Sequence, residues 1–196
     1  MFLTADEVHR SLRGTVDLLH SKVEGLQAFD MSERGFWHSF AAILLTLPAY
    51  VITLALERIR LGYRLASGNV FDGLWIDLVV GLGHVAGFLA LPMAMIFLSR
   101  ALGLTSRYVP FVVVTNWIAV ASIMVLSFPS LLLLIGWATP ALAGLFTFAF
   151  CLLVLRVQWF ATKLTLGVPG LLSLAIVSLG LVFNLLIDSA VHDVLV

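Results

Sequence analysis

The most constraining feature of this sequence is a stretch of 48 residues, from Tyr108 to Leu155, that contains no Asp, Glu, Lys, Arg or His. As one straight α-helix it would be about 72 Å long, which is more than twice the roughly 30 Å hydrocarbon thickness of a bilayer. The stretch therefore predicts two membrane spans that fold back on each other. It indicates an integral, multi-span α-helical membrane protein.

Composition agrees with this class of protein. The chain has 196 residues, of which 61% are hydrophobic and 11% are charged, whereas a soluble domain has about 25% charged residues. Lys plus Arg and Asp plus Glu balance at 11 each, so there is no basic excess that would favour nucleic acid as a partner. The single cysteine, Cys151, lies in an apolar stretch and is interpreted as a packing residue.

The sequence divides into a cytoplasmic amphipathic helix with its linker, residues 1–35, and a five-span transmembrane bundle, residues 36–196. Thr4 and Glu7 have the spacing of a reciprocal capping box at the start of the first helix. This helix is too polar to span a bilayer, and we expect it to lie in the membrane interface, dock on the bundle or pair with a partner helix. Its apolar stripe consists of Val8, Leu12, Val16, Leu19, Val23 and Leu26.

Five hydrophobic segments are expected to cross the membrane, at Trp37–Leu56, Gly73–Ser99, Val109–Phe128, Ala141–Ala161 and Leu171–Val191. Pro48 should kink the first of them. Pro129, Gly136 and Pro140 should form the turn between the third and fourth. A re-entrant segment at 129–140, or six spans, is the alternative layout.

The positive charges predict the orientation of the bundle. Seven Lys and Arg residues would lie on the side of the amino terminus, and three, Arg58, Arg60 and Arg64, on the other side. This bias favours a cytoplasmic amino terminus. Aromatic residues agree, because Trp37, Tyr108 and Trp159 fall at the inner boundary and Trp75 and Trp137 at the outer one.

The run from Tyr108 to Trp117, Tyr-Val-Pro-Phe-Val-Val-Val-Thr-Asn-Trp, is followed by Pro129 and Pro140. Together with five closely spaced spans, it resembles the Yip family of membrane proteins, including bacterial members of unassigned function. The resemblance covers about Trp37 to the end and implies a role in organising membranes through contacts with other membrane proteins. The compact chain favours a bacterial inner membrane. The run from Phe29 to Trp37 resembles a local sequence motif.

A first group of polar residues is expected near the outer side. Asp77 and His84 are seven residues apart in the second span, and Asn184, Asp188 and His192 follow one another at intervals of four near the end. Charged groups in a membrane are costly and usually face a bundle interior or water. We expect one outward-opening cluster, which would be either a proton, cation or metal site or a set of structural hydrogen bonds between helices.

A second group of polar residues is expected near the inner side. Asn116 and Arg156 lie at similar depth in the third and fourth spans, and a contact between them would close that hairpin. Alternatively, Arg156 extends towards the headgroups. Gly83 and Gly87 form a GxxxG spacing, for which packing within the bundle is the favoured interpretation.

No catalytic site is expected. Asp77 and Asp188 could suggest an intramembrane aspartyl protease, but His84 stands where the presenilin-like GxGD motif needs its acid. We therefore expect no catalytic, cofactor or metal residues. The preferred hypothesis is a non-enzymatic membrane organiser or complex subunit, whose partners are the bilayer and other membrane proteins. The alternative is a small transporter or channel that uses Asp77, His84 and Asp188.

Overall fold

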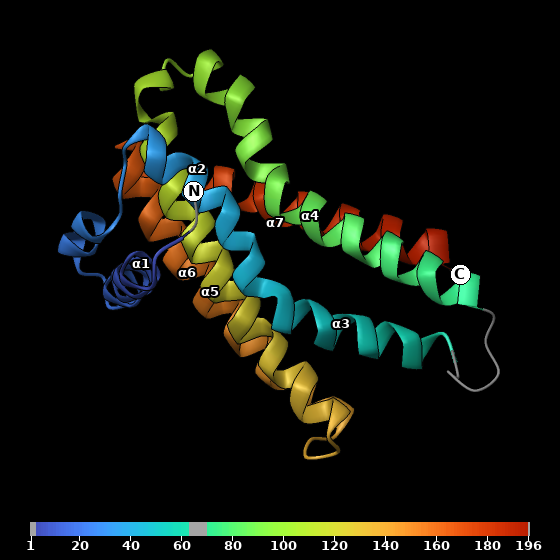
Figure 1. Ribbon diagram of the computed structural model, residues 1–196. Coiled ribbons are helices and arrows are strands. Elements are labelled where there is room, and N and C mark those ends of the chain that lie inside the picture. Colours follow the sequence, from blue (N-terminus) through green and yellow to red (C-terminus); the bar gives the residue numbers. More distant parts are fainter. Residues whose placement is uncertain (1–2, 63–69, 196) are drawn as a thin grey trace.

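The computed structural model describes residues 3–62 and 70–195, and these residues form helices and no strand (Figure 1). The all-helical fold class is confirmed. The helices are α1 (Ala5–Leu19), η1 (Val23–Ala28), α2 (Glu33–Ala41), η2 (Ala42–Thr46), α3 (Leu47–Arg60), α4 (Val70–Ala101), η3 (Thr105–Arg107), α5 (Tyr108–Leu134), α6 (Pro140–Leu166) and α7 (Gly170–Leu195).

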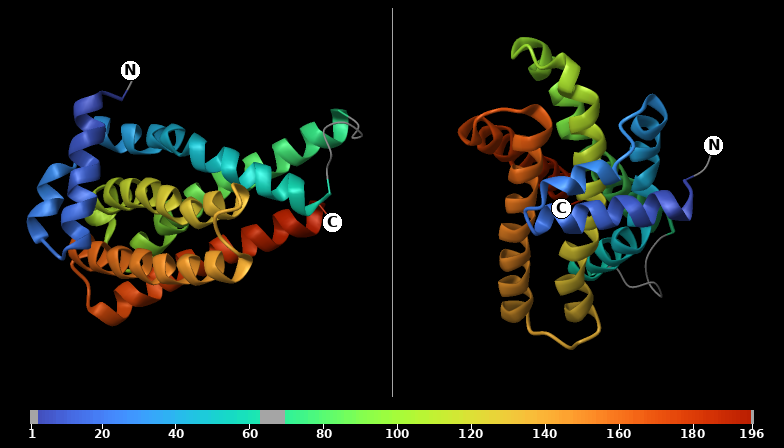
Figure 2. Two further views of the ribbon diagram at one scale, coloured as in Figure 1. Left: turned by 90° about the horizontal axis from the view of Figure 1, so that it is seen from below. Right: turned by 90° about the vertical axis from the view of Figure 1, so that its left-hand side faces the viewer.

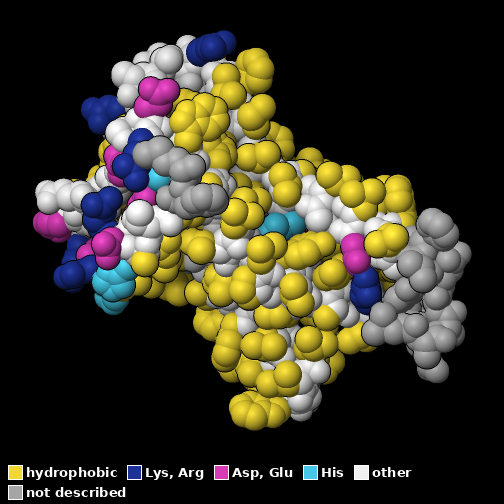
Figure 3. All heavy atoms as spheres, in the orientation of Figure 1, with side chains coloured by type: hydrophobic (Ala, Val, Ile, Leu, Met, Phe, Trp, Pro, Cys, Tyr) yellow, Lys and Arg dark blue, Asp and Glu magenta, His cyan; other side chains and the backbone are white. Residues whose placement is uncertain are grey.

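Five helical segments are long and apolar enough to cross a membrane, as predicted. They are Glu33–Arg60, Gly73–Ala101, Thr105–Leu134, Pro140–Leu166 and Gly170–Leu195. Many of their large hydrophobic side chains are exposed, which is the surface that lipid requires. Hydrophobic atoms cover most of the face in Figure 3, and charged side chains gather mainly around α1.

One predicted boundary is wrong. Pro129 lies inside α5, which continues to Leu134, so this proline is not in the turn. Membrane helices tolerate such a proline because neighbouring groups can satisfy the freed carbonyl. The α2 helix begins at Glu33, and the division expected at residue 35 stays a prediction.

The first span is interrupted, as predicted from Pro48. The 3₁₀ helix η2 separates α2 from α3, and Pro48 occupies the first turn of α3. Proline has no backbone N–H, so it fits a helix start better than a helix interior. The α4 helix also bends within its length (Figure 1), and Pro92 lies inside it.

The five spans form a closed ring of packed helices. In ring order, α3 packs on α4, α4 on α7, α7 on α6, α6 on α5, and α5 again on α3. Figure 2 shows α5 and α6 between α3 and α7 when the bundle is seen from below. The two arms, α5–α6 and α3–α4–α7, diverge away from the end that carries α1 (Figure 1).

The α1 helix lies across one end of the bundle (Figure 2) and packs on α5 and α6. Docking on the bundle was one of the three expected placements. Apart from Leu18, the buried face, however, is made of small and polar residues, among them Glu7, Ser11 and Gly14. Leu12 and Val16 of the predicted apolar stripe are exposed.

The core is concentrated at the α1 end of the ring. The amino-terminal half of α5 is almost fully buried, with Phe111, Trp117 and Ile118 at 1% exposure or less. Leu18 of α1 and Phe29 pack in one cluster with Trp117 and Ile118. A second cluster, built around Met95, Phe111, Leu166 and Ile176, packs beside it. This end of the ring is therefore closed by side chains.

Candidate binding cavity

A cavity of about 600 Å³ lies inside the ring and is lined by α3, α4, α5, α6 and α7. Cavities of this size hold small-molecule ligands. Its walls are mostly apolar, and polar side chains reach it from all five helices. These are Tyr50, Thr53, Glu57, Arg60, His84, Thr115, Asn116, Ser122, Cys151, Gln158, Thr162, Asn184, Asp188 and His192.

The contribution of α3 was missed by sequence reasoning. Tyr50, Thr53, Glu57 and Arg60 follow one another at intervals of three, four and three residues, which places them on one helix face. Arg60 Nη1 donates to Glu57 Oε1 at 3.0 Å. The spacing was a usable signal, but Glu57 and Arg60 were assigned to a loop because the first span was ended at Leu56.

His84 is held at the middle of the cavity by neighbours from the first span. Its Nε2 lies 2.7 Å from Thr46 Oγ1, and Thr46 Oγ1 donates to the Ile43 carbonyl at 2.6 Å. Because the single hydroxyl proton of Thr46 is used there, His84 Nε2 must be the donor to Thr46. The Tyr50 ring lies 5.6 Å from the His84 ring, centre to centre.

The cavity floor is polar and neutral. Asn116 is 1% exposed, and its Nδ2 donates to Ser39 Oγ at 3.1 Å. Thr162 is fully buried, and its Oγ1 has no hydrogen-bond partner within the described part of the chain. An unsatisfied buried hydroxyl costs free energy unless something binds it.

The cavity opens away from α1. The packed clusters close the α1 end, whereas Asp188 and His192 of the lining are exposed at the opposite end. Ionisable groups are thus concentrated at the mouth and amide and hydroxyl groups at the floor.

The contact between α4 and α7 explains the GxxxG spacing. A Cβ atom at Gly83 would lie 2.5 Å from Val191 Cγ2, and one at Gly87 would lie 2.8 Å from Asn184 Oδ1. Asn184 Nδ2 donates to the Gly180 carbonyl at 2.9 Å. The two glycines therefore serve packing inside the bundle, as predicted.

The predicted outer cluster is only partly correct. His84, Asn184, Asp188 and His192 line the cavity, but Asp77 does not. Asp77 Oδ1 instead accepts a hydrogen bond from Arg58 Nε at 3.1 Å and a second from Nη2 of the same side chain. No three His, Cys, Asp or Glu side chains converge as a metal site in residues 3–62 and 70–195.

The predicted contact between Arg156 and Asn116 is wrong. Arg156 Nη1 donates to the Leu19 carbonyl at 3.0 Å and Nη2 to Ser21 Oγ at 2.9 Å. Leu19 ends α1, where backbone carbonyls lack helical partners. Arg156 therefore caps α1 and fixes it to α6, while Asn116 bonds Ser39.

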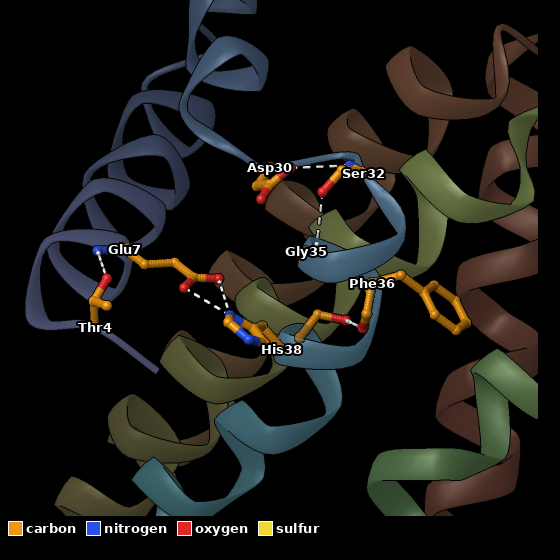
Figure 4. A network of polar contacts seen from close by, with 8 residues as sticks. Thr4, Glu7, Asp30, Ser32, Gly35, Phe36 and His38 are labelled. Carbon is orange, nitrogen blue, oxygen red and sulfur yellow. Dashed lines mark hydrogen bonds and ion pairs between the residues drawn. The ribbon is translucent and has the colours of Figure 1, made fainter. Parts of the chain in front are cut away.

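A separate polar network fixes the amino-terminal segment to the first span (Figure 4). Thr4 Oγ1 accepts from the Glu7 N–H at 3.3 Å, as a capping box requires. The Glu7 carboxylate does not complete the box, because it binds His38 Nδ1 at 2.8 and 3.0 Å. Both side chains of this pair are less than 10% exposed.

The run from Phe29 to Trp37 has a structural role at the start of α2. Asp30 Oδ1 accepts from the Ser32 N–H at 3.0 Å, and Ser32 Oγ accepts from the Gly35 N–H at 3.2 Å (Figure 4). A Cβ atom at Gly35 would overlap the Asp30 carbonyl, so the turn requires glycine. The hydrogen bonds from Ser32 lower the pKa of Asp30 below its ordinary value.

Comparisons with protein-family models, with curated proteins and with solved structures found no match. The resemblance to the Yip family therefore stays a prediction. The fold and the cavity define an integral membrane protein of the multi-pass helical class.

Proposed function

We propose that this chain is a non-enzymatic membrane protein that binds a small solute inside its ring of helices, as a small transporter or carrier does. The observation that carries the proposal is the cavity closed at one end and lined by polar groups from all five spans. Such groups are expensive in a membrane and are typical of solute pathways. Four of the residues that line it, His84, Asn116, Asn184 and Asp188, were candidates from the sequence.

The direction of opening follows from the predicted topology. With a cytoplasmic amino terminus, α1 would lie at the inner surface and the mouth would face outward. In a bacterial inner membrane the cavity would then take up solute from the periplasmic side. The positive-charge bias of the sequence supports this orientation.

Cys151 provides the direct test, because it lines the cavity and is the single cysteine of the chain. The protein in lipid nanodiscs is treated with a small, membrane-impermeant methanethiosulfonate reagent. We expect Cys151 to react, since thiols react as thiolates in contact with water.

The matched control moves the thiol by one residue, in a Cys151→Ala, Leu152→Cys variant. Leu152 is 53% exposed on the outer surface of α6 and does not line the cavity. We expect this thiol to react at least tenfold more slowly because it faces lipid. Equal rates at both positions, or no reaction at Cys151, would contradict a water-filled cavity.

A second candidate function is the predicted Yip-like organiser, and the surface of α1 supports it. Leu12, Val16 and Val23 leave apolar side chains exposed beside the bundle, and exposed apolar patches are typical of contact sites. If this surface binds a partner protein, a Leu12→Glu, Val16→Glu variant should lose a protein that copurifies from native membranes in mild detergent. Unchanged copurification would exclude this surface as the contact.

A further inference from the structure

The charged lining of the cavity is not balanced. Among the described residues, the lining contains the carboxylates of Glu57 and Asp188 and the guanidinium of Arg60. Glu57 and Arg60 pair with each other at 3.0 Å. Asp188 forms no ion pair with any residue in 3–62 or 70–195. Glu57, Arg60 and Asp188 together therefore leave one uncompensated negative charge in this lining.

The walls between the mouth and the floor are apolar. They include Phe88, Leu91, Val177 and Leu181, and the ring of Tyr50 faces the same space. Transfer of the apolar part of a ligand from water to these walls would be favourable. A positive charge on the ligand would be attracted to Asp188 and could also contact an aromatic face.

An inorganic cation fits this lining poorly. Hard metal ions take six or more oxygen ligands. Zinc takes three to four protein ligands, mostly nitrogen and sulfur atoms. No group of three such acidic, histidine or cysteine ligands occurs in the described residues. The lining instead combines one carboxylate outside any ion pair, that of Asp188, with a large apolar volume, so that one charge and much hydrophobic surface are recognised together.

We propose that the cavity binds hydrophobic monovalent organic cations, with the charge held by Asp188 and the apolar body against the walls of α4 and α7. The inference rests on the proposed solute-binding function.

The test uses two probes of nearly identical size and shape but opposite charge, tetraphenylphosphonium and tetraphenylborate. Each is added to the wild-type protein in nanodiscs before Cys151 is labelled with the uncharged reagent N-ethylmaleimide. We expect tetraphenylphosphonium to slow labelling at least tenfold in a saturable manner, and tetraphenylborate to leave the rate within twofold. Equal protection by both ions would overturn the proposed charge selectivity.

Three variants assign the charge to its residue. Asp188→Asn should raise the half-protecting concentration of tetraphenylphosphonium about tenfold, and Asp188→Glu should keep it near the wild-type value. Asp193→Asn is the matched control, because Asp193 is exposed on the same helix and does not line the cavity. Equal effects of Asp188→Asn and Asp193→Asn would overturn the role of Asp188.

The two proposals can fail separately. If N-ethylmaleimide and the methanethiosulfonate both label Cys151 but tetraphenylphosphonium gives no protection, the solute cavity stands and its cation preference is wrong. If the methanethiosulfonate does not reach Cys151, both are wrong. The comparison of the two ions needs only the wild-type protein, so a variant that fails to fold does not prevent a decision.

Discussion

At the scale of single residues, two pairs of buried polar side chains join segments that are far apart in the sequence. Glu7 and His38 are 31 positions apart, and Asn116 and Ser39 are 77 apart. Each pair ties a different segment to the first span. Removing one partner of a buried hydrogen-bonded pair leaves the other unsatisfied, which costs more than the bond itself contributes.

The Glu7–His38 pair gives a prediction for stability. Glu7→Ala should lower the free energy of unfolding by about 2 kcal/mol, because it leaves His38 buried without its acceptor. The double variant Glu7→Ala, His38→Leu should lose less than the sum of the two single changes. Unfolding midpoints in mild detergent measure this, with the exposed Asp6→Ala as control. Strict additivity would show that the two side chains are not coupled.

Asp30 gives a prediction for pH dependence. Because its hydrogen bonds with Ser32 lower the pKa in the folded protein, its ionised form favours folding above the ordinary carboxyl pKa of about 3.9. This contribution is lost as the pH falls through the lowered folded value. We expect the thermal midpoint to fall less between about pH 5 and about pH 2 in Asp30→Asn than in wild type. Identical pH profiles would contradict it.

At the scale of elements, α1 shows three different sides. Small and polar residues such as Ser11 and Gly14 face the bundle, Leu12 and Val16 form an exposed apolar flank, and Arg10 and Arg13 are exposed. Gly14 is required where α1 meets η1, because a Cβ atom there would lie 2.9 Å from the Gly25 carbonyl oxygen. Close backbone contact at Gly14 and burial of Leu18 together decide which side of α1 packs inward.

Arg156 gives a prediction for the attachment of α1. Arg156→Ala removes both hydrogen bonds to the end of α1, so this helix should open more often while the spans stay folded. Amide hydrogen exchange over residues 5–20 should become at least fivefold faster, with exchange in α5 unchanged. Lys22→Ala is the control, since Lys22 is an exposed partner of Asp17 on the same segment. Unchanged exchange after Arg156→Ala would show that the α1 packing alone holds the helix.

At the scale of the whole molecule, ring closure creates the cavity. Each helix of the ring packs on its two ring neighbours, and α4 also contacts α5. The densely packed α1 end keeps the arms together while they diverge at the other end (Figure 1). The cavity thus results from the packing of all five spans together. A side chain that fills it should block the access of reagents to Cys151 without changing the outer surface of the bundle.

A cavity-filling variant tests this arrangement. Ala119 of α5 lines the cavity and faces its interior, so Ala119→Trp should slow the labelling of Cys151 at least tenfold. Ala149→Trp is the matched control, because Ala149 is exposed on α6 outside the lining. It should leave the rate within twofold. Circular dichroism and monodispersity in detergent confirm that each variant is folded. Unchanged labelling in Ala119→Trp would contradict the cavity as described.

Much of the fold was predictable from the sequence because lipid acts on each segment separately. A helix that crosses a bilayer must satisfy its own backbone and expose apolar side chains, so length and hydropathy identify it without knowledge of its neighbours. The five spans, the break at Pro48 and the packing role of Gly83 and Gly87 follow from such local rules.

The candidate site was predictable only in part, because partners depend on packing between distant segments. His84 and Asp188 were identified as unusual residues in spans, but whether Asp77 joined them depended on Arg58 from another helix. Likewise, Arg156 bonds α1 and not Asn116, because α1 crosses the end of the bundle.

What the amino-acid sequence alone determined is that lipid surrounds the bundle and that five long apolar segments form it. Hydrophobicity and length are properties of each segment by itself. What only the tertiary structure decided is the order of the helices in the ring, the cavity they enclose and the partner of each polar group. The physical reason is that those features arise from the way side chains far apart in the chain fit together in space.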